Sequence, residues 1–392
     1  MAHPESTIVN DRFASRLALV YSGFFLNAGW QVPLFPVWLS ARGLDAAGIG
    51  LVLAAMQAIR VVATPAGTRL ADRHGALNRA IVVAALASAC AVALLASVNG
   101  FALILAAALL LSFASAPLLP LIDAHGLTGL RLYARSYGPV RLWGSVAFIV
   151  ANLTGGVLLG VLAKSQLIWL IFTGQCVIAA AALMLVRLPG GARKEDALGH
   201  SHLRQPAFLA ITAAGSLIQA SHAVYYGFAT LDWTEKGYAG TTIGVLWALG
   251  VVAEIVLFAL SARLPAAIGP AALILIGAAG AVLRWVATAM DPPFALLAPL
   301  QLLHALSFGA THLGTMMFLM RSAPEGSRAA AQGDMATANT LVMAAASALA
   351  GTLYGAGGSL AYLAMAAIAG LGAGCALVAA RRIQPHKAGV AG

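Results

Sequence analysis

Charged residues are scarce in this chain. Only 9% of its 392 residues are Asp, Glu, Lys or Arg, whereas 61% are hydrophobic. A soluble domain carries about 25% charged residues, so this chain has too few to cover a water-facing surface. The mean hydropathy of +0.88 agrees with that conclusion. We expect an all-α integral membrane protein.

Cysteine is rarer still, and its three positions lie inside apolar runs without Cys-x-x-Cys spacing: Cys90, Cys176 and Cys375. Such thiols are typical small packing residues, so we predict no disulfide, no metal and no cofactor. The motifs HExxH, GxSxG and GxxxxGK[ST] are also missing, which leaves a membrane enzyme as a distant alternative. The polar stretch 1–16 lacks a cleavage site after an apolar core, so the first apolar run is expected to be a retained helix.

Long apolar runs fill most of the chain. Each is close to the length that crosses a hydrocarbon core of ~30 Å. The sequence predicts twelve membrane spans, near residues 14–38, 46–66, 80–98, 100–123, 138–161, 166–188, 206–232, 241–262, 268–290, 293–317, 330–353 and 358–380.

The positive charges follow one side of this map. Most of the 23 Lys and Arg residues lie on the side of the two termini, and only Arg42, Lys164 and Lys236 lie opposite. Because positive residues stay on the cytoplasmic side, we predict a bacterial inner-membrane protein with both termini in the cytoplasm. The net charge of +10 then reflects topology, and we expect no nucleic-acid partner.

The chain also contains an internal repeat. A Gly- and charge-rich stretch near the midpoint predicts a cytoplasmic linker at 189–205 between an amino-terminal bundle (1–188) and a carboxy-terminal bundle (206–392). A shift of 194 residues places Ile49-Gly50 on Ile243-Gly244 and Arg69-Leu70 on Arg263-Leu264. Parallel repeats of this kind place a transport site near the membrane midplane, between the halves.

The stretch GTRLADRHGALNR, at 67–79, carries the first family resemblance. It resembles the cytoplasmic loop signature of the major facilitator superfamily, in which the loop latches the cytoplasmic ends of the two halves. The resemblance implies twelve transmembrane helices in two six-helix, pseudo-symmetric bundles. It also implies a cytoplasmic gate formed by Gly67, Asp72, Arg73, Gly75 and Arg79. An ordinary positive loop is the alternative, and the counterpart loop at 261–270 has lost the acid, since Ala266 stands where Asp72 would repeat.

Four longer stretches resemble the phenylpropionate permease family: 137–148, 221–233, 244–260 and 303–313. This resemblance implies a secondary active transporter that imports a small aromatic monocarboxylate by proton symport with alternating access and works as a monomer. Transport of a neutral sugar or nucleoside, or export of a drug, by the same fold remains the alternative. An anion importer needs a cavity arginine without an acidic partner, whereas a neutral-substrate symporter would neutralise both intramembrane arginines.

Three charged residues lie deep inside predicted spans, well away from the span ends: Arg60, Glu254 and Arg284. Each costs roughly 2.5–3.5 kcal/mol at the bilayer centre, so a wet cavity or a partner is expected. The 194-residue shift places Arg60 on Glu254, which predicts that the two face each other at equal depth across the halves. We predict that Arg60 clamps the substrate carboxylate through its planar fork and that Arg284 pairs with Glu254. The reverse assignment, and structural pairing of both arginines, stay open.

More distantly, the chain resembles lactose permease, which has a Glu on helix 8, an Arg on helix 9 and a His on helix 10. The matching residues here are Glu254, Arg284 and His304, and the resemblance implies proton coupling through them. The second acid of that pattern is replaced by Ser307, so Glu254 must combine two tasks or share them with His304. A neutral His304 bound to a neighbouring helix is the structural alternative.

Polar and aromatic residues in the predicted spans complete the candidate set. Asn27 and Gln31 share one helix face at i, i+4, and His304 lies near mid-depth. Cavity lining or helix packing is open for each of them. The predicted substrate-binding residues besides Arg60 are Asn27, Gln31, Gln219, His222, Tyr225, Tyr226 and His304. We further predict that His312 is structural and that Asp123 and Arg141 form an ion pair bracing the cytoplasmic gate.

Overall fold

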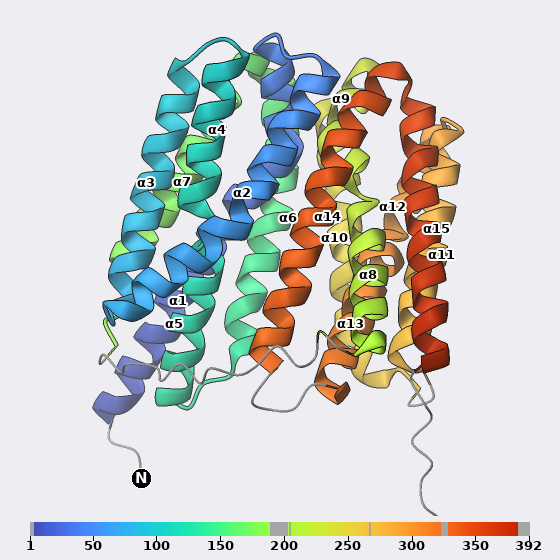
Figure 1. Cartoon of the computed structure of the whole chain (residues 1–392). Helices are drawn as coiled ribbons and strands as arrows, with labels where there is room; N and C mark the ends of the chain where they lie inside the picture. Colours follow the sequence, from blue (N-terminus) through green and yellow to red (C-terminus); the bar gives the residue numbers. More distant parts are fainter. Residues whose placement is uncertain (1–3, 189–202, 204, 266–267, 323–327, 383–392) are drawn as a thin grey trace, which may run out of the picture. The chain divides into compact units, whose positions relative to one another are not determined.

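The computed structural model describes residues 4–188, 203, 205–265, 268–322 and 328–382. In the amino-terminal part the helices are α1 (Pro4–Ala41), α2 (Ala46–Arg73), α3 (Leu77–Ser97), α4 (Phe101–Ser115), α5 (Leu118–Leu132), α6 (Tyr137–Val161), η1 (Lys164–Gln166) and α7 (Ile168–Leu183). In the carboxy-terminal part they are α8 (Pro206–Ala220), α9 (Ala223–Glu235), α10 (Gly240–Leu260), η3 (Ser261–Arg263), α11 (Pro270–Ala289), α12 (Phe294–Leu302), η4 (Ala305–Ala310), α13 (Thr311–Ser322), α14 (Arg328–Ala356) and α15 (Gly358–Arg382). Figure 1 shows these helices in chain order.

The predicted all-helical membrane fold is confirmed. Eleven described stretches are long and apolar enough to cross a membrane, and their bounds follow the predicted spans 46–66 to 358–380. The first predicted span, 14–38, lies inside the 38-residue α1. Some spans consist of more than one helical piece: α4 and α5, for example, make up a single span, Phe101–Leu132, with Pro117 at the start of α5. No strand is found in the described residues.

Contacts between Cα atoms divide the chain into two compact units. Unit 1 contains 1–195, 224–252 and 347–356, and unit 2 contains 196–223, 253–346 and 357–392. The division departs from the predicted halves because parts of α9, α10 and α14 group with the amino-terminal helices. Most of the predicted linker, 189–205, lies outside the described residues. The bundle boundaries therefore stay a prediction.

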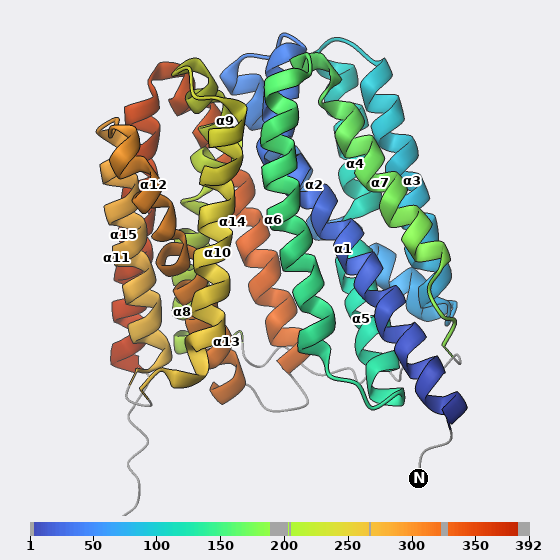
Figure 2. The same cartoon turned by 180° about the vertical axis from the view of Figure 1, so that it is seen from behind.

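Unit 1 is built around α1. This helix packs against α6 and α7, as Figure 2 shows, and α3 packs against α4 and α7. A core of fully buried side chains joins α1, α5 and α7: Phe13, Leu17, Tyr21, Leu118, Ile122, Ile178 and Ala182. Exposed side chains on α3 and α4, such as Val83 and Leu103, are consistent with a lipid-facing surface.

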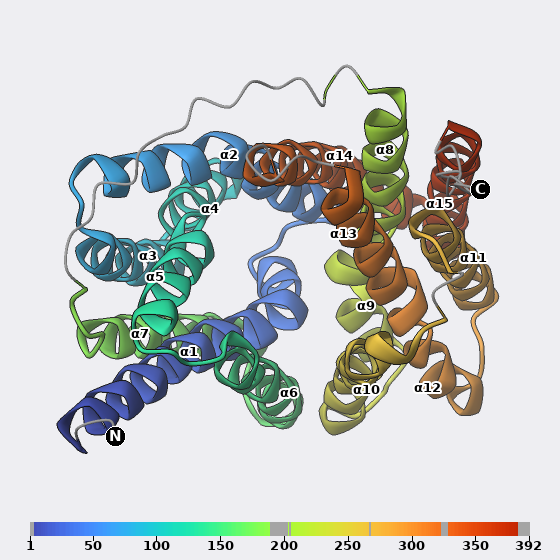
Figure 3. The same cartoon turned by 90° about the horizontal axis from the view of Figure 1, so that it is seen from below.

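Unit 2 is built around α11. This helix packs against α15 and the π-helical segment η4, and α8 packs against α15, which Figure 3 shows from below. Close approach of α11 and η4 requires glycine, because a Cβ on Gly280 would lie 2.7 Å from the Cβ of Leu306. Two interruptions shape this unit: the turn at Ser221 and His222 between α8 and α9, and η4 itself. Single π-helical turns inside α-helices occur frequently at functional sites.

Candidate functional site

Arg284 of α11 lies at the centre of a buried polar network in unit 2. Its side chain is only 1% exposed. Its Nη2 donates to Gln301 Oε1 at 2.8 Å, its Nη1 lies 3.1 Å from His304 Nδ1, and its Cζ lies 4.6 Å from the ring centre of Trp285. Membrane-buried charge is costly unless it is bound in this way. These contacts remove Arg284 from direct contact with a large ligand.

The geometry around His304 fixes its tautomer. A guanidinium has no acceptor, so Nδ1 of His304 must accept from Arg284. A neutral imidazole then carries its proton on Nε2, and Nε2 lies 3.6 Å from Glu254 Oε2. A second proton on Nδ1 would break the bond to Arg284 and place two cations in contact. The network therefore runs from Glu254 on α10 through a neutral His304 to Arg284.

His222 is held on both ring nitrogens. Its Nδ1 lies 3.2 and 3.1 Å from the carbonyl oxygens of Ile218 and Gln219, which only accept, so Nδ1 donates. Its Nε2 accepts from Ser307 Oγ at 3.0 Å. The side chain is completely buried. Ser307, which replaces the second acid of the lactose permease pattern, thus binds the histidine of the α8–α9 turn.

Two further residues support this network and were missed in the sequence. Gln301 precedes His304 by three residues, and this spacing puts both on one helix face. The spacing is the sequence signal that could have identified Gln301. Trp285 follows Arg284 and donates from Nε1 to Ser221 Oγ at 2.9 Å. Ser221 in turn donates to Ile218 O at 2.6 Å. The α8–α9 turn is thereby tied to α11.

Arg60 differs from Arg284 in its surroundings. It lies on α2 in unit 1, and its side chain is exposed. No described residue of unit 1 forms a hydrogen bond or an ion pair with it. Its predicted position opposite Glu254 concerns residues in different units and stays a prediction.

Asn27 and Gln31 are predicted cavity residues on α1 of unit 1. Asn27 donates to Gln31 Oε1 at 3.1 Å, which confirms that they share a face of α1. Asn27 is 5% exposed, and its Oδ1 has no hydrogen-bond partner among the described residues.

Tyr225 and Tyr226 belong to an aromatic cluster of α9 and α10. The ring of Tyr225 lies 4.5 Å from that of Trp247 and 6.0 Å from that of Trp233. Tyr225 is 4% exposed, whereas Tyr226 is half-buried. The packing interpretation fits Tyr225 best. Both substrate-binding assignments stay predictions.

The predicted gate stretch, 67–79, consists of the last turns of α2, which ends at Arg73, a short turn, and the start of α3 at Leu77. Gly75 has φ +57°, a left-handed conformation that glycine adopts without strain. A Cβ on Gly67 would lie 2.6 Å from the Cβ of Pro117, so Gly67 permits close contact with the start of α5. Both glycines therefore occupy positions that require glycine. Asp72 and Arg73 are exposed and Arg79 is exposed at the start of α3, and the latch itself stays a prediction.

The predicted ion pair between Asp123 and Arg141 was wrong. Asp123 Oδ1 instead accepts from the hydroxyls of Tyr21, at 2.5 Å, and Tyr137, at 3.1 Å. The Cζ of Arg141 lies over the rings of Phe25 and Tyr21, at 3.8 and 5.6 Å from their centres. Charge complementarity predicted a partner, but tyrosines on α1 and α6 supply the donors and aromatic rings take up the cation.

Comparison with known proteins decides the family. The model of the MFS_1 like family matches residues 14–364, nearly the whole chain. This chain belongs to that family. It is a multi-pass membrane transporter of the major facilitator superfamily, not an enzyme.

The chain is 32% identical to the "Probable 3-phenylpropionic acid transporter" of Escherichia coli (strain K12) over 77% of this chain and 81% of that one. It is 27% identical to the "Maltose permease" of Geobacillus stearothermophilus over 78% and 79%. The crystal structure of the nucleoside transporter NupG superposes with a TM-score of 0.78, at 17% identity, over 95% of this chain and 99% of that one. The structural likeness shows the fold, and the first relative confirms the predicted family.

Proposed function

We propose that this transporter imports a small, phenylpropionate-like aromatic monocarboxylate by proton symport with alternating access. We place it in the bacterial inner membrane, with both termini in the cytoplasm and the six-helix halves at 1–188 and 206–392. Support for the cargo comes from the relative named as a probable 3-phenylpropionic acid transporter. Support for the mechanism comes from the intramembrane charges.

The contrast between the two arginines is the observation that carries the proposal. Arg284 is buried and bound by Gln301 and His304, whereas Arg60 is exposed and has no described partner in unit 1. An uncompensated guanidinium in a membrane span requires an anion or water. A carboxylate matches its fork in two parallel bonds. Arg60 therefore binds the cargo carboxylate, and Arg284 organises the proton site.

Glu254 carries the proton in this mechanism. Its side chain is 21% exposed, whereas His304 is 8% exposed and held neutral by Arg284. Protonation of Glu254 removes the only negative charge in the Glu254–His304–Arg284 network, and loss of that proton restores it. A proton that moves together with a monocarboxylate carries no net charge across the membrane, so the pH gradient drives the accumulation, by about tenfold per pH unit.

A neutral polyol is the second candidate cargo. The 27% identity to a maltose permease over 78% of the chain favours it. In that case Arg60 would bind hydroxyls or a carboxylate of the protein instead of the cargo, and removal of its charge would affect sugars and organic acids alike.

Counterflow in proteoliposomes tests the proposal. The panel is phenylpropionate, cinnamate, benzoate, lactose and uridine, with wild type, Arg60→Gln, Arg60→Lys and the exposed control Lys164→Gln. We expect exchange of the aromatic acids, a loss of at least about tenfold in Arg60→Gln and no loss in Lys164→Gln. Exchange of lactose or uridine without any aromatic acid would overturn the cargo assignment.

Proton coupling is tested in the same vesicles. An inward-directed proton gradient should drive uptake by wild type. Glu254→Gln, which mimics the protonated carboxyl, should keep counterflow but lose the response to the gradient. Gradient-driven accumulation by Glu254→Gln would remove Glu254 from the coupling mechanism.

A further inference from the structure

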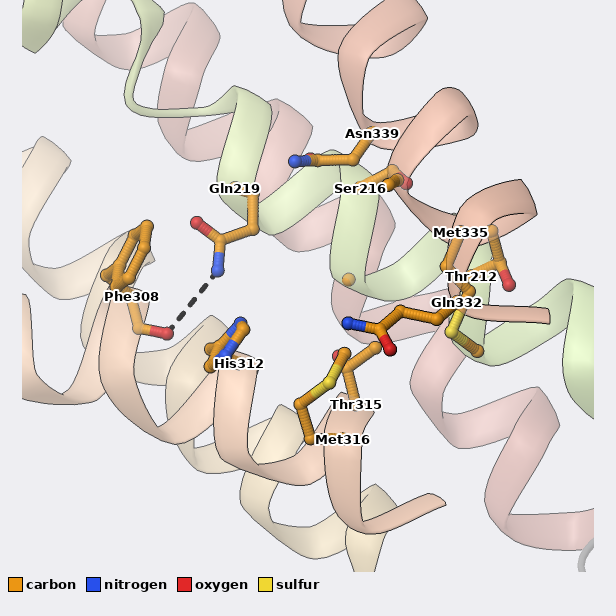
Figure 4. A pocket seen from close by; sticks show the side chains of 12 residues that line it. Thr212, Ser216, Gln219, Phe308, His312, Thr315, Met316, Gln332, Met335 and Asn339 are labelled. Carbon is orange, nitrogen blue, oxygen red and sulfur yellow. Dashed lines mark hydrogen bonds between the residues drawn. The ribbon is translucent and has the colours of Figure 1, made fainter. Parts of the chain in front are cut away.

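A second polar cavity in unit 2 has no role in the proposed coupling network. It measures about 220 Å³ and lies between α8, the η4–α13 segment and α14. Figure 4 shows the amides of Gln219 and Gln332 and the imidazole of His312 converging on it, with Asn339 at its rim. We call it the α14 pocket. None of its twelve described lining residues is Asp, Glu, Lys or Arg, so it offers no counter-ion to a charged group.

Several polar groups of the α14 pocket have unused hydrogen-bonding capacity. Thr212 Oγ1 and Asn339 Oδ1 are buried without a hydrogen-bond partner in the described part of the chain. The side chains of Gln332 and His312 likewise hydrogen-bond to no described residue. Unsatisfied polar groups are expensive in a membrane protein. The two buried unpaired atoms, together with the exposed side chains of Gln332 and His312, come from three helices around one cavity and indicate a ligand that both donates and accepts.

The remaining walls of the α14 pocket suit a flat ring. The rings of Phe308 and His312 are stacked, 6.2 Å apart and 12° from parallel. The thioethers of Met316, on α13, and Met335, on α14, also line the pocket, and such groups adapt to an aromatic edge. A cavity of about 150 Å³ holds benzene, so this pocket has room for a ring with a hydroxyl group.

We propose that the α14 pocket binds an uncharged, hydroxyl-bearing six-membered ring, namely the ring of the cargo. A hydroxyl both donates and accepts, as the amides of Gln332 and Asn339 do. The inference deepens the proposed function and rests on it. It makes the transporter selective for hydroxylated aromatic acids over their unsubstituted parents.

Competition against labelled 3-phenylpropionate in proteoliposomes tests this selectivity. The competitors are 3-phenylpropionate and 3-(3-hydroxyphenyl)propionate, with wild type, Gln332→Leu, Asn339→Leu and the control Thr337→Val. Thr337 is exposed on α14 and bonded to Gly333 O. Wild type and control should bind the hydroxylated acid roughly five- to tenfold more tightly. Both leucine variants should lose that advantage.

A second measurement separates failure of the pocket from failure of the proposed cargo. Gln332→Cys is introduced after Cys90, Cys176 and Cys375 have been replaced by alanine, and its alkylation is timed with resorcinol or toluene present. Resorcinol should slow alkylation at least fivefold more than toluene does. If no aromatic acid competes but resorcinol protects, the cargo is wrong and the pocket stands. Equal protection by both rings, or a hydroxyl preference that survives in both leucine variants, overturns the pocket.

Discussion

Gly50 of α2 lies directly against Gly351 of α14. A Cβ on Gly50 would lie 2.6 Å from the Cα of Gly351. The point where α2 and α14 meet is thus a close helix crossing made by glycines. A second such crossing lies within unit 1, where a Cβ on Gly156 of α6 would lie 2.7 Å from the Cα of Gly244 on α10. Gly50 and Gly244 are the pair that the 194-residue repeat places on each other. The internal repeat of the sequence therefore appears as two equivalent glycine crossings.

Any side chain at these crossings should force the helices apart. We predict that Gly351→Val and Gly156→Val each reduce transport at least about tenfold, because backbone atoms occupy the space that a Cβ needs. Cysteines at Ala46 and Gly355, whose Cβ positions lie 3.6 Å apart, should form a disulfide in the parent. That disulfide should form poorly in Gly351→Val, because it spans the same pair of helices. Gly374→Val is the control, because a Cβ there meets no described atom within 4 Å. Undiminished cross-linking in Gly351→Val, or undiminished transport in both valine variants, would contradict the prediction.

Gln301 should stabilise the fold through Arg284. In Gln301→Leu the Arg284 guanidinium keeps its hydrogen bond to His304 but loses the one to Gln301 Oε1, which is 2.8 Å long in the wild type. Loss of a hydrogen bond to a buried charged group costs about 1.5–3 kcal/mol, so the melting temperature in detergent should fall. Gln301→Glu should restore the acceptor and the stability. A melting temperature of Gln301→Leu equal to that of wild type would show that other contacts hold Arg284.

The sequence predicted the spans far better than the partners of the polar residues. Span positions follow from runs of apolar residues, which depend on the chain alone. The partner of a polar residue depends on helix rotation and on interruptions such as η4 and the Ser221–His222 turn. Asp123 illustrates the difference: its position was predicted, but two hydroxyls bind it and not Arg141. Gln332 and Asn339 gave no signal because isolated amides carry no motif.

Substitutions at His304 should separate the roles of its two ring nitrogens. The amide oxygen of His304→Asn replaces Nδ1 and accepts from Arg284, whereas His304→Gln places its amide where Nε2 faces Glu254. We predict that His304→Asn keeps the thermal stability of wild type but loses most gradient-driven uptake. His304→Leu should lose both, by about 1–3 kcal/mol in stability. Normal proton-driven uptake by His304→Asn would exclude the Nε2–Glu254 contact, 3.6 Å long, from coupling.

The hydroxyls on Asp123 should matter more than the charge of Arg141. Tyr21→Phe and Tyr137→Phe each remove one donor from a half-buried carboxylate, and each should destabilise unit 1 by about 1–2 kcal/mol. The double variant should cost less than the sum of the two, because both donors serve one oxygen atom. Arg141→Met keeps apolar contact with Phe25 and should cost less than either tyrosine change. If Arg141→Met proves the most destabilising of the three in thermal unfolding, charge pairing through space dominates and the hydroxyl interpretation fails.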